Sequence, residues 1–118
     1  MRYLTIFKAE ERPDSSISQD EMVAMGKLIE EMARAGVLIT TEGCHDSSSG
    51  ARVRRSGGKV TVTDGPFTES KEVIGGFALL QVDSLQDAIT WTKRFVEVAG
   101  DGESEIRQLY DTPAYPPG

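Results

Sequence analysis

The segment Asp64–Glu72, which reads DGPFTESKE, combines turn-forming residues with carboxylate, hydroxyl and ammonium side chains. Its Asp-Gly pair favours a turn, and its proline keeps the preceding residue out of the helical conformation. Hydroxyl groups later in the segment can bond to nearby backbone amides and hold one loop shape. We predict that this loop and the end of an earlier strand line a cleft for a small molecule. The predicted ligand-binding residues are Glu42, Asp64, Thr68, Glu69 and Lys71.

His45 is the single histidine of the chain and follows that earlier strand in a polar loop. An imidazole exchanges a proton near neutral pH, and Asp64 or Glu42 could orient it. His45 and Asp64 are therefore the candidate catalytic residues. Two plainer interpretations stay open: His45 could be an exposed loop residue, and the Asp64 carboxylate could cap the turn. The sequence also leaves open whether the protein is an enzyme.

A metal site is not expected. Cys44, His45 and Asp46 are consecutive, and consecutive side chains rarely converge on one ion. No spaced pair of ligands supports them. The sequence also lacks a phosphate-binding glycine loop and a nucleophile–base motif. We therefore expect no cofactor.

A second charged feature is a predicted β-hairpin over residues 51–63, whose two alternating segments are joined by Ser56-Gly57-Gly58. Arg52 and Arg54 share one face of its first strand. They could bind a phosphate or a carboxylate. Alternatively, the positive charges only protect a solvated hairpin from edge pairing.

The rest of the pattern predicts the elements that must position these groups. Ser18 begins a helix with a capping box completed by Glu21, and Gly36 ends it. A second helix begins after Ser84 and stops at Gly100. Alternating apolar residues predict further strands at residues 2–8, 37–42, 73–82 and 103–109.

This order predicts an α+β fold, a ferredoxin-like split βαβ sheet with both helices on one face and an extra β-hairpin. Strands 2–8 and 73–82 form the central pair, and both carry apolar residues on both faces. By our assignment, the face without helices carries Tyr3, Phe7, Phe77 and Leu79. Because a monomer would expose this patch, we predict a homodimer that packs sheet against sheet.

Composition is ordinary for one globular domain: 118 residues, 38% hydrophobic and 27% charged. We expect residues 1–110 to form that domain and the proline-rich residues 111–118 to form a tail. The net charge of −6 argues against nucleic acid as a general partner. No apolar run approaches the roughly 20 residues of a membrane span. We expect no signal peptide, so the predicted location is the cytoplasm.

The segment Asp64–Glu72 and the Gly75-Gly76-Phe77 that follows are similar to the signature of DGPF proteins in the YCII-related family. The opening Met1-Arg2-Tyr3, the helix exit at residues 35–38 and Glu42-Gly43 also resemble that family. The resemblance thus covers nearly the whole chain. It implies a bacterial protein that forms a dimeric α+β barrel, in a family largely without an assigned activity.

The same resemblance bears on function. Better-studied YCII-type relatives have a proposed His/Asp catalytic pair, with the histidine near the start of the first helix; residues 18–25 contain no histidine here. We therefore expect an uncharacterised YCII-related homodimer that binds a small molecule at the 64–72 loop. The alternative is a regulatory or interaction module that associates with an extracytoplasmic-function sigma factor. Such a partner would meet the basic hairpin or the surface around Trp91.

Overall fold

The structure is a computed structural model that describes residues 1–13, 16–67 and 72–111. Each predicted helix and strand forms. In chain order the elements are β1 (Arg2–Ala9), α1 (Gln19–Arg34), β2 (Leu38–Gly43), the 3-10 turn η2 (Ser47–Ser49), β3 (Ala51–Ser56), β4 (Lys59–Asp64), β5 (Val73–Gln81), α2 (Leu85–Ala99) and β6 (Glu103–Gln108).

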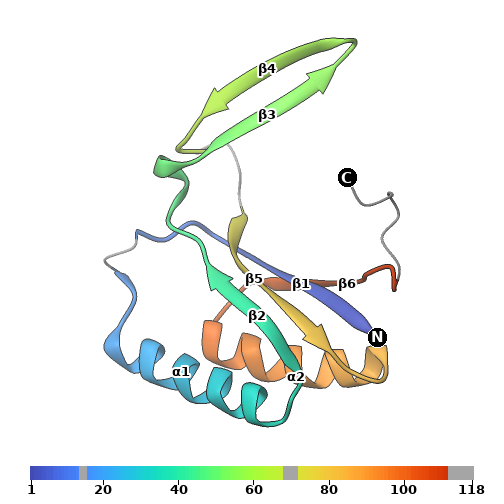
Figure 1. Ribbon diagram of the computed structural model, residues 1–118. Coiled ribbons are helices and arrows are strands. Elements are labelled where there is room, and N and C mark those ends of the chain that lie inside the picture. The colour runs from blue at the N-terminus through green and yellow to red at the C-terminus, as the bar shows by residue number, and fades with distance from the viewer. Residues whose placement is uncertain (14–15, 68–71, 112–118) are drawn as a thin grey trace.

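The strands form two separate sheets. One is four-stranded and antiparallel, in the order β2-β5-β1-β6, and the other is the hairpin of β3 and β4. As predicted, β1 and β5 are the central pair. Both helices cover the same face of the larger sheet (Figure 1). The protein therefore has the predicted ferredoxin-like α+β fold, with the hairpin inserted between β2 and β5.

Local signals set both ends of α1. The Ser18 hydroxyl accepts a hydrogen bond from the Glu21 amide at 3.1 Å, as the capping box predicts. At the other end Gly36 has φ 74°, and the Val37 amide donates to the Met32 carbonyl at 3.1 Å. A left-handed residue followed by this bond closes a helix and favours glycine. The helix therefore runs into β2 without a long connection.

The space between helices and sheet holds the core. Its buried members are Tyr3, Leu28, Met32, Leu80, Val82 and Ala88. Tyr3 is 4% exposed, and the Phe7 ring meets Phe95 of α2 edge to face, with 5.5 Å between centroids. The prediction that Tyr3 and Phe7 lie on the open face is therefore wrong.

The strand register explains this error. Leu4 lies opposite Leu79, and Ile6 lies opposite Phe77. Opposed residues share a face and successive residues alternate, so these four lie on the open face while Tyr3 points to the helices. Each face of β1 carries large apolar side chains, so the alternation alone does not show which face the helices cover. Phe77 remains 36% exposed there.

Trp91 of α2 is partly buried against the core, and the Arg94 guanidinium lies over its ring, 5.2 Å from the centroid. Arg94 in turn forms an ion pair with Glu31 of α1 at 2.5 Å. One side of the Trp91 ring is thus covered by an arginine that pairs the two helices. Within the described ranges, no helix is long and apolar enough to cross a membrane.

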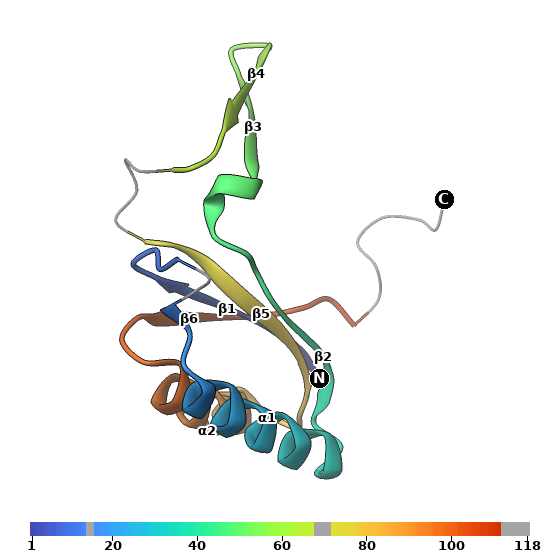
Figure 2. The ribbon, with the colours of Figure 1, turned by 90° about the vertical axis from the view of Figure 1, so that its left-hand side faces the viewer.

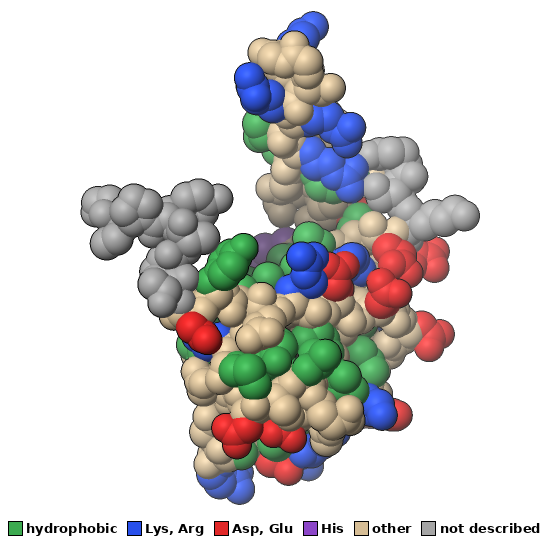
Figure 3. Space-filling view, turned by 90° about the vertical axis from the view of Figure 1, so that its right-hand side faces the viewer, with side chains coloured by type: hydrophobic (Ala, Val, Ile, Leu, Met, Phe, Trp, Pro, Cys, Tyr) green, Lys and Arg blue, Asp and Glu red, His purple; other side chains and the backbone are tan. Residues whose placement is uncertain are grey.

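The β3–β4 hairpin stands away from the body. It rises from the four-stranded sheet on the side opposite the helices (Figures 1 and 2). All of its residues except Arg52 are exposed. Lys and Arg side chains gather on it in the space-filling view (Figure 3).

Candidate functional site

A cleft of about 580 Å³ opens between α1 and the four-stranded sheet. Its walls are the first half of α1, the loop after β1, the end of β2, the start of β5 and the end of α2. The fold creates it because α1 and α2 cover the sheet completely only where the core residues lie. Toward the start of α1, the helix and the sheet separate.

The floor of the cleft is apolar. On α1 the lining residues are Met22, Met25, Gly26 and Ile29, a spacing that places them on one helix face. Phe7 and Phe95 complete the floor from the sheet and α2. A Cβ atom built on Gly26 meets nothing within 4 Å, so the helix leaves open space there. Met22 and Met25 thus line the cleft in the first half of α1, whereas Met32 in the second half is buried in the core.

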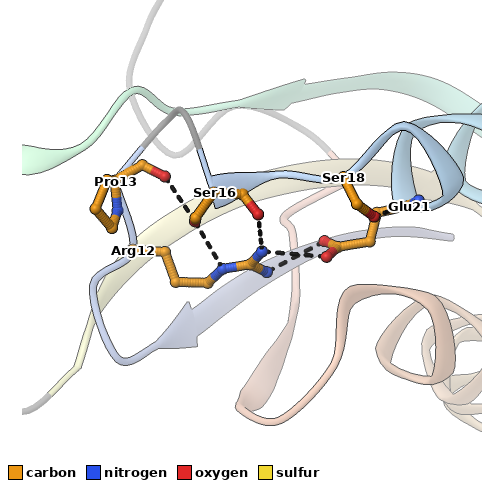
Figure 4. A network of polar contacts seen from close by, with 5 residues as sticks. All are labelled: Arg12, Pro13, Ser16, Ser18 and Glu21. Atoms are coloured by element: carbon orange, nitrogen blue, oxygen red, sulfur yellow. Dashed lines mark hydrogen bonds and ion pairs between the residues drawn. The ribbon is translucent and has the colours of Figure 1, made fainter.

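Arg12 and Glu21 form the polar edge nearest α1 (Figure 4). Two guanidinium nitrogens of Arg12 bond to the two Glu21 carboxylate oxygens, each at 3.1 Å. The Arg12 guanidinium also donates to the Ser16 carbonyl at 2.9 Å. The guanidinium lowers the pKa of Glu21 below its ordinary value, mainly through these hydrogen bonds. This pair fixes the loop after β1 against the start of α1.

The end of β2 and the loop after it form the opposite edge, where Glu42 and the exposed His45 are among the lining residues. Glu42 lies opposite Phe77, so its side chain is on the open face of the sheet. The Cys44 amide donates to the Gly75 carbonyl at 2.9 Å, which continues the pairing of β2 with β5 as far as this loop. A Cβ atom on Gly76 would lie 2.8 Å from the Glu42 carbonyl oxygen. Glycine at this position therefore lets the two strands approach where they form this edge of the cleft.

The described part of the DGPF segment, Asp64–Phe67, contacts the turn at residues 47–50. The Gly65 amide donates to the Gly50 carbonyl, and the Phe67 amide donates to the Ser47 hydroxyl, both at 2.9 Å. The Arg52 guanidinium lies over the Phe67 ring, 3.9 Å from its centroid. These contacts fasten the base of the hairpin to the turn at residues 47–50.

Glycine at position 65 is required by that attachment. A Cβ atom there would lie 1.6 Å from the Ser47 carbonyl oxygen and 2.7 Å from its carbon. The Glu11 carboxylate accepts a hydrogen bond from the Ser47 amide and so ties the same turn to the loop after β1. The hairpin base is thereby connected to the edge of the cleft through Ser47.

Comparison with known proteins assigns the chain to a family. The sequence profile of the YCII-related domain matches residues 1–112. The chain belongs to the YCII-related family. It is also 30% identical over 97 residues to an uncharacterised protein of Rhizobium meliloti (strain 1021), covering 81% of this chain and 75% of that protein.

In this YCII-related protein, the predicted site residues fall into three groups. Glu42 and His45 line the cleft. Asp64 lies at the end of β4 and is not among the described residues that line it. Thr68, Glu69 and Lys71 lie outside the described residues.

Sequence reasoning did not place Arg12, Glu21, Met22 or Met25 at the site. The signals were present, because the methionine spacing and the capping-box glutamate are visible in the sequence, but core packing and helix capping account for both. Carboxylates, an imidazole and a thiol at the rim of an apolar cleft can hold a small amphipathic molecule and exchange protons with it. No group of three or more potential metal ligands occurs among the described residues.

Proposed function

We propose that this YCII-related protein binds a small molecule in the cleft between α1 and the sheet. The observation that carries the proposal is the cleft itself, since its volume of about 580 Å³ lies in the range of known ligand sites. An apolar floor with a few polar groups at the edge is the usual lining of such sites. The proposed site takes in the predicted residues Glu42 and His45, which line the cleft, and leaves out Asp64, which is not among the described lining residues.

The lining also supports a ligand class. Acidic residues outnumber basic ones around the cleft. Arg12 is the one Lys/Arg residue among the described lining residues, and the acidic ones are Glu10, Glu11, Glu21, Glu42 and Asp46. Arg12 is paired with Glu21, whereas Glu11 and Asp46 accept hydrogen bonds from the backbone amides of Ser47 and Ser48 and keep their negative charge. This excess of negative charge favours a neutral or cationic head group over an anion. The proposed ligand therefore has an apolar body and an amine or hydroxyl head. His45 is the group that a proton-transfer step would use.

Gly26 offers a direct test, because it faces open space on a helix. Gly26→Leu places a side chain in the cleft, and Gly26→Ala is its matched control. Both replacements raise helix propensity by roughly 0.5–1 kcal/mol, so neither should destabilise the fold. We expect a thermal-shift screen of small amphipathic amines and alcohols to yield compounds that raise the melting temperature of wild type and Gly26→Ala, with no rise in Gly26→Leu. A rise that persists unchanged in Gly26→Leu would place the ligand elsewhere.

We also propose that the protein is a homodimer formed through the open sheet face. Leu4, Ile6, Phe77 and Leu79 supply the apolar surface that supports it. We expect Phe77→Asp with Leu79→Asp to convert a dimer into a folded monomer in light scattering. A wild-type monomer at all concentrations would refute this part. Association with a sigma factor stays a prediction from the family resemblance.

A further inference from the structure

The β3–β4 hairpin has two unlike faces. Val53 lies opposite Val62, and Val60 is two residues away on the same strand, so these three valines share one face. On the other face Arg54 lies opposite Thr61, and Arg52 lies opposite Thr63. Ala51 and Arg55 flank Val53 on the valine face, where Arg55 lies opposite Val60 and Ala51 lies opposite Asp64. The hairpin therefore has one face with three valines at its centre and one basic, hydroxyl-rich face.

The valine face is exposed in the single chain. Val53, Val60 and Val62 are 71%, 59% and 64% exposed. The hairpin pairs with no other strand of the described structure. Two strands alone in water are at best marginally stable, and a row of valines suits a packed surface rather than solvent. The hairpin thus needs a partner on its valine face.

Position and charge indicate which partner. The hairpin rises on the open side of the sheet, opposite the helices, so a molecule that covered the open face would also meet the hairpin (Figure 2). The chain has 13 Lys/Arg and 19 Asp/Glu residues; residues 51–64 contain four of the basic residues and one of the acidic residues. The rest of the chain therefore contains nine basic and 18 acidic residues. A basic arm on an acidic body is complementary to a second copy of the same body.

We propose that the β3–β4 hairpin is a dimerisation arm whose valine face packs on a second copy of this chain. The inference rests on the proposed homodimer and extends it, because the arm adds a second contact beside the open sheet face. In the dimer the arm becomes ordered against its partner.

Hydrogen exchange on the wild-type protein tests the arm without any substitution. Amides of residues 51–64 are compared at concentrations above and below the dissociation constant found by sedimentation. We expect them to exchange at least about tenfold more slowly in the dimer. Unchanged exchange in a proven dimer overturns the arm and leaves the sheet-face dimer standing, whereas a monomer at all concentrations overturns both. Protection that arises only on adding duplex DNA overturns the arm as well.

A matched pair of variants gives a second readout. Val53→Glu with Val62→Lys removes the valine face but places opposite charges directly across the hairpin, so the turn and net charge are kept. Thr61→Lys with Thr63→Glu makes the same charge changes on the basic face. We expect the first variant to raise the dimer dissociation constant at least about tenfold and the second to change it by less than about twofold. Equal effects of the two variants overturn the arm.

Discussion

In the DGPF segment the residues make close structural contacts, whereas in the cleft they surround open space. In the described part of the segment, Gly65 and Phe67 bond to the 47–50 turn and hold the hairpin. In the cleft, residues from five separate elements surround open space, and the polar groups stand at its rim. The first region is built by close backbone approach and tolerates no added atom at Gly65. The second is built by leaving space, and a side chain fits at Gly26.

The difference separates two kinds of variant. Changes in the segment should alter local stability and leave the cleft's ligand chemistry intact. Changes in the cleft should alter binding and leave stability nearly intact.

Gly65→Ala should give the largest effect. The new methyl group would lie 1.6 Å from the Ser47 carbonyl oxygen, so the backbone of one of the two segments must move. We expect the free energy of local opening of residues 47–67 to fall by about 3 kcal/mol, as in severe overpacking. Native-state hydrogen exchange measures this, with the core amide of Leu80 as an internal reference. Gly50→Ala is the control, because its methyl group would make an ordinary 3.6 Å contact with the same carbonyl.

Ser47→Ala should have a smaller effect at the same attachment. Ser47 is buried, and its hydroxyl oxygen accepts the Phe67 amide at 2.9 Å. Its loss leaves that amide without its acceptor, at a cost of about 1–2 kcal/mol in local opening. Ser49→Ala, at an exposed position of the same turn, should cost little. Equal losses in both variants would show that the hydroxyl does not hold the segment.

Glu10→Gln probes the edge of the cleft without changing the size of the side chain. If the head group of the ligand is an amine, loss of the carboxylate charge should weaken binding about tenfold while the melting temperature of the free protein is unchanged. Isothermal titration of a compound from the amine screen measures the change. Glu30→Gln, on the exposed side of α1 and away from the cleft, should bind as wild type does. Unchanged affinity in Glu10→Gln would rule out an amine held by this carboxylate.

The smallest expected effect is on acid stability. Arg12 lowers the pKa of Glu21, so the folded state binds this proton less readily than the unfolded state, whose pKa is near the ordinary 4.5. The resulting stabilisation is present above that pH and is lost as pH falls through the lower folded-state value. The urea midpoint of the wild type should therefore fall between about pH 7 and pH 3 by slightly more than that of Arg12→Gln. The difference is small because the pair is exposed. Lys27→Gln, on α1, is the control; an identical acid loss in wild type and Arg12→Gln would contradict the assignment.

The fold was largely predictable because its signals are local. Ser18 and Gly36 mark the ends of α1, and the apolar alternation of β1 and β5 marks the central strands. The face of β1 that packs against the helices was not predictable, because Leu4 and Ile6 on one face are as apolar as Tyr3 and Phe7 on the other. Only the register with β5, a contact between segments about 70 residues apart, decides it.

The site was predictable only in part, for a similar reason. Glu42 and His45 follow directly from the end of β2, so their place at a sheet end could be inferred. Arg12 and Met22 reach the cleft only because the loop after β1 returns to the start of α1, through the Arg12–Glu21 pair. Asp64 illustrates the opposite case, since it lies at the base of the hairpin opposite Ala51 and is not among the described residues that line the cleft.

The most direct test of the division between segment and cleft is a map of backbone amide chemical shifts during titration with a compound from the thermal-shift screen. The account predicts shift changes at residues 22–29 and 43–46 in wild type and in Gly26→Ala, and their absence in Gly26→Leu. Changes confined to Asp64–Phe67 and the hairpin, with the α1 amides unmoved, would contradict it.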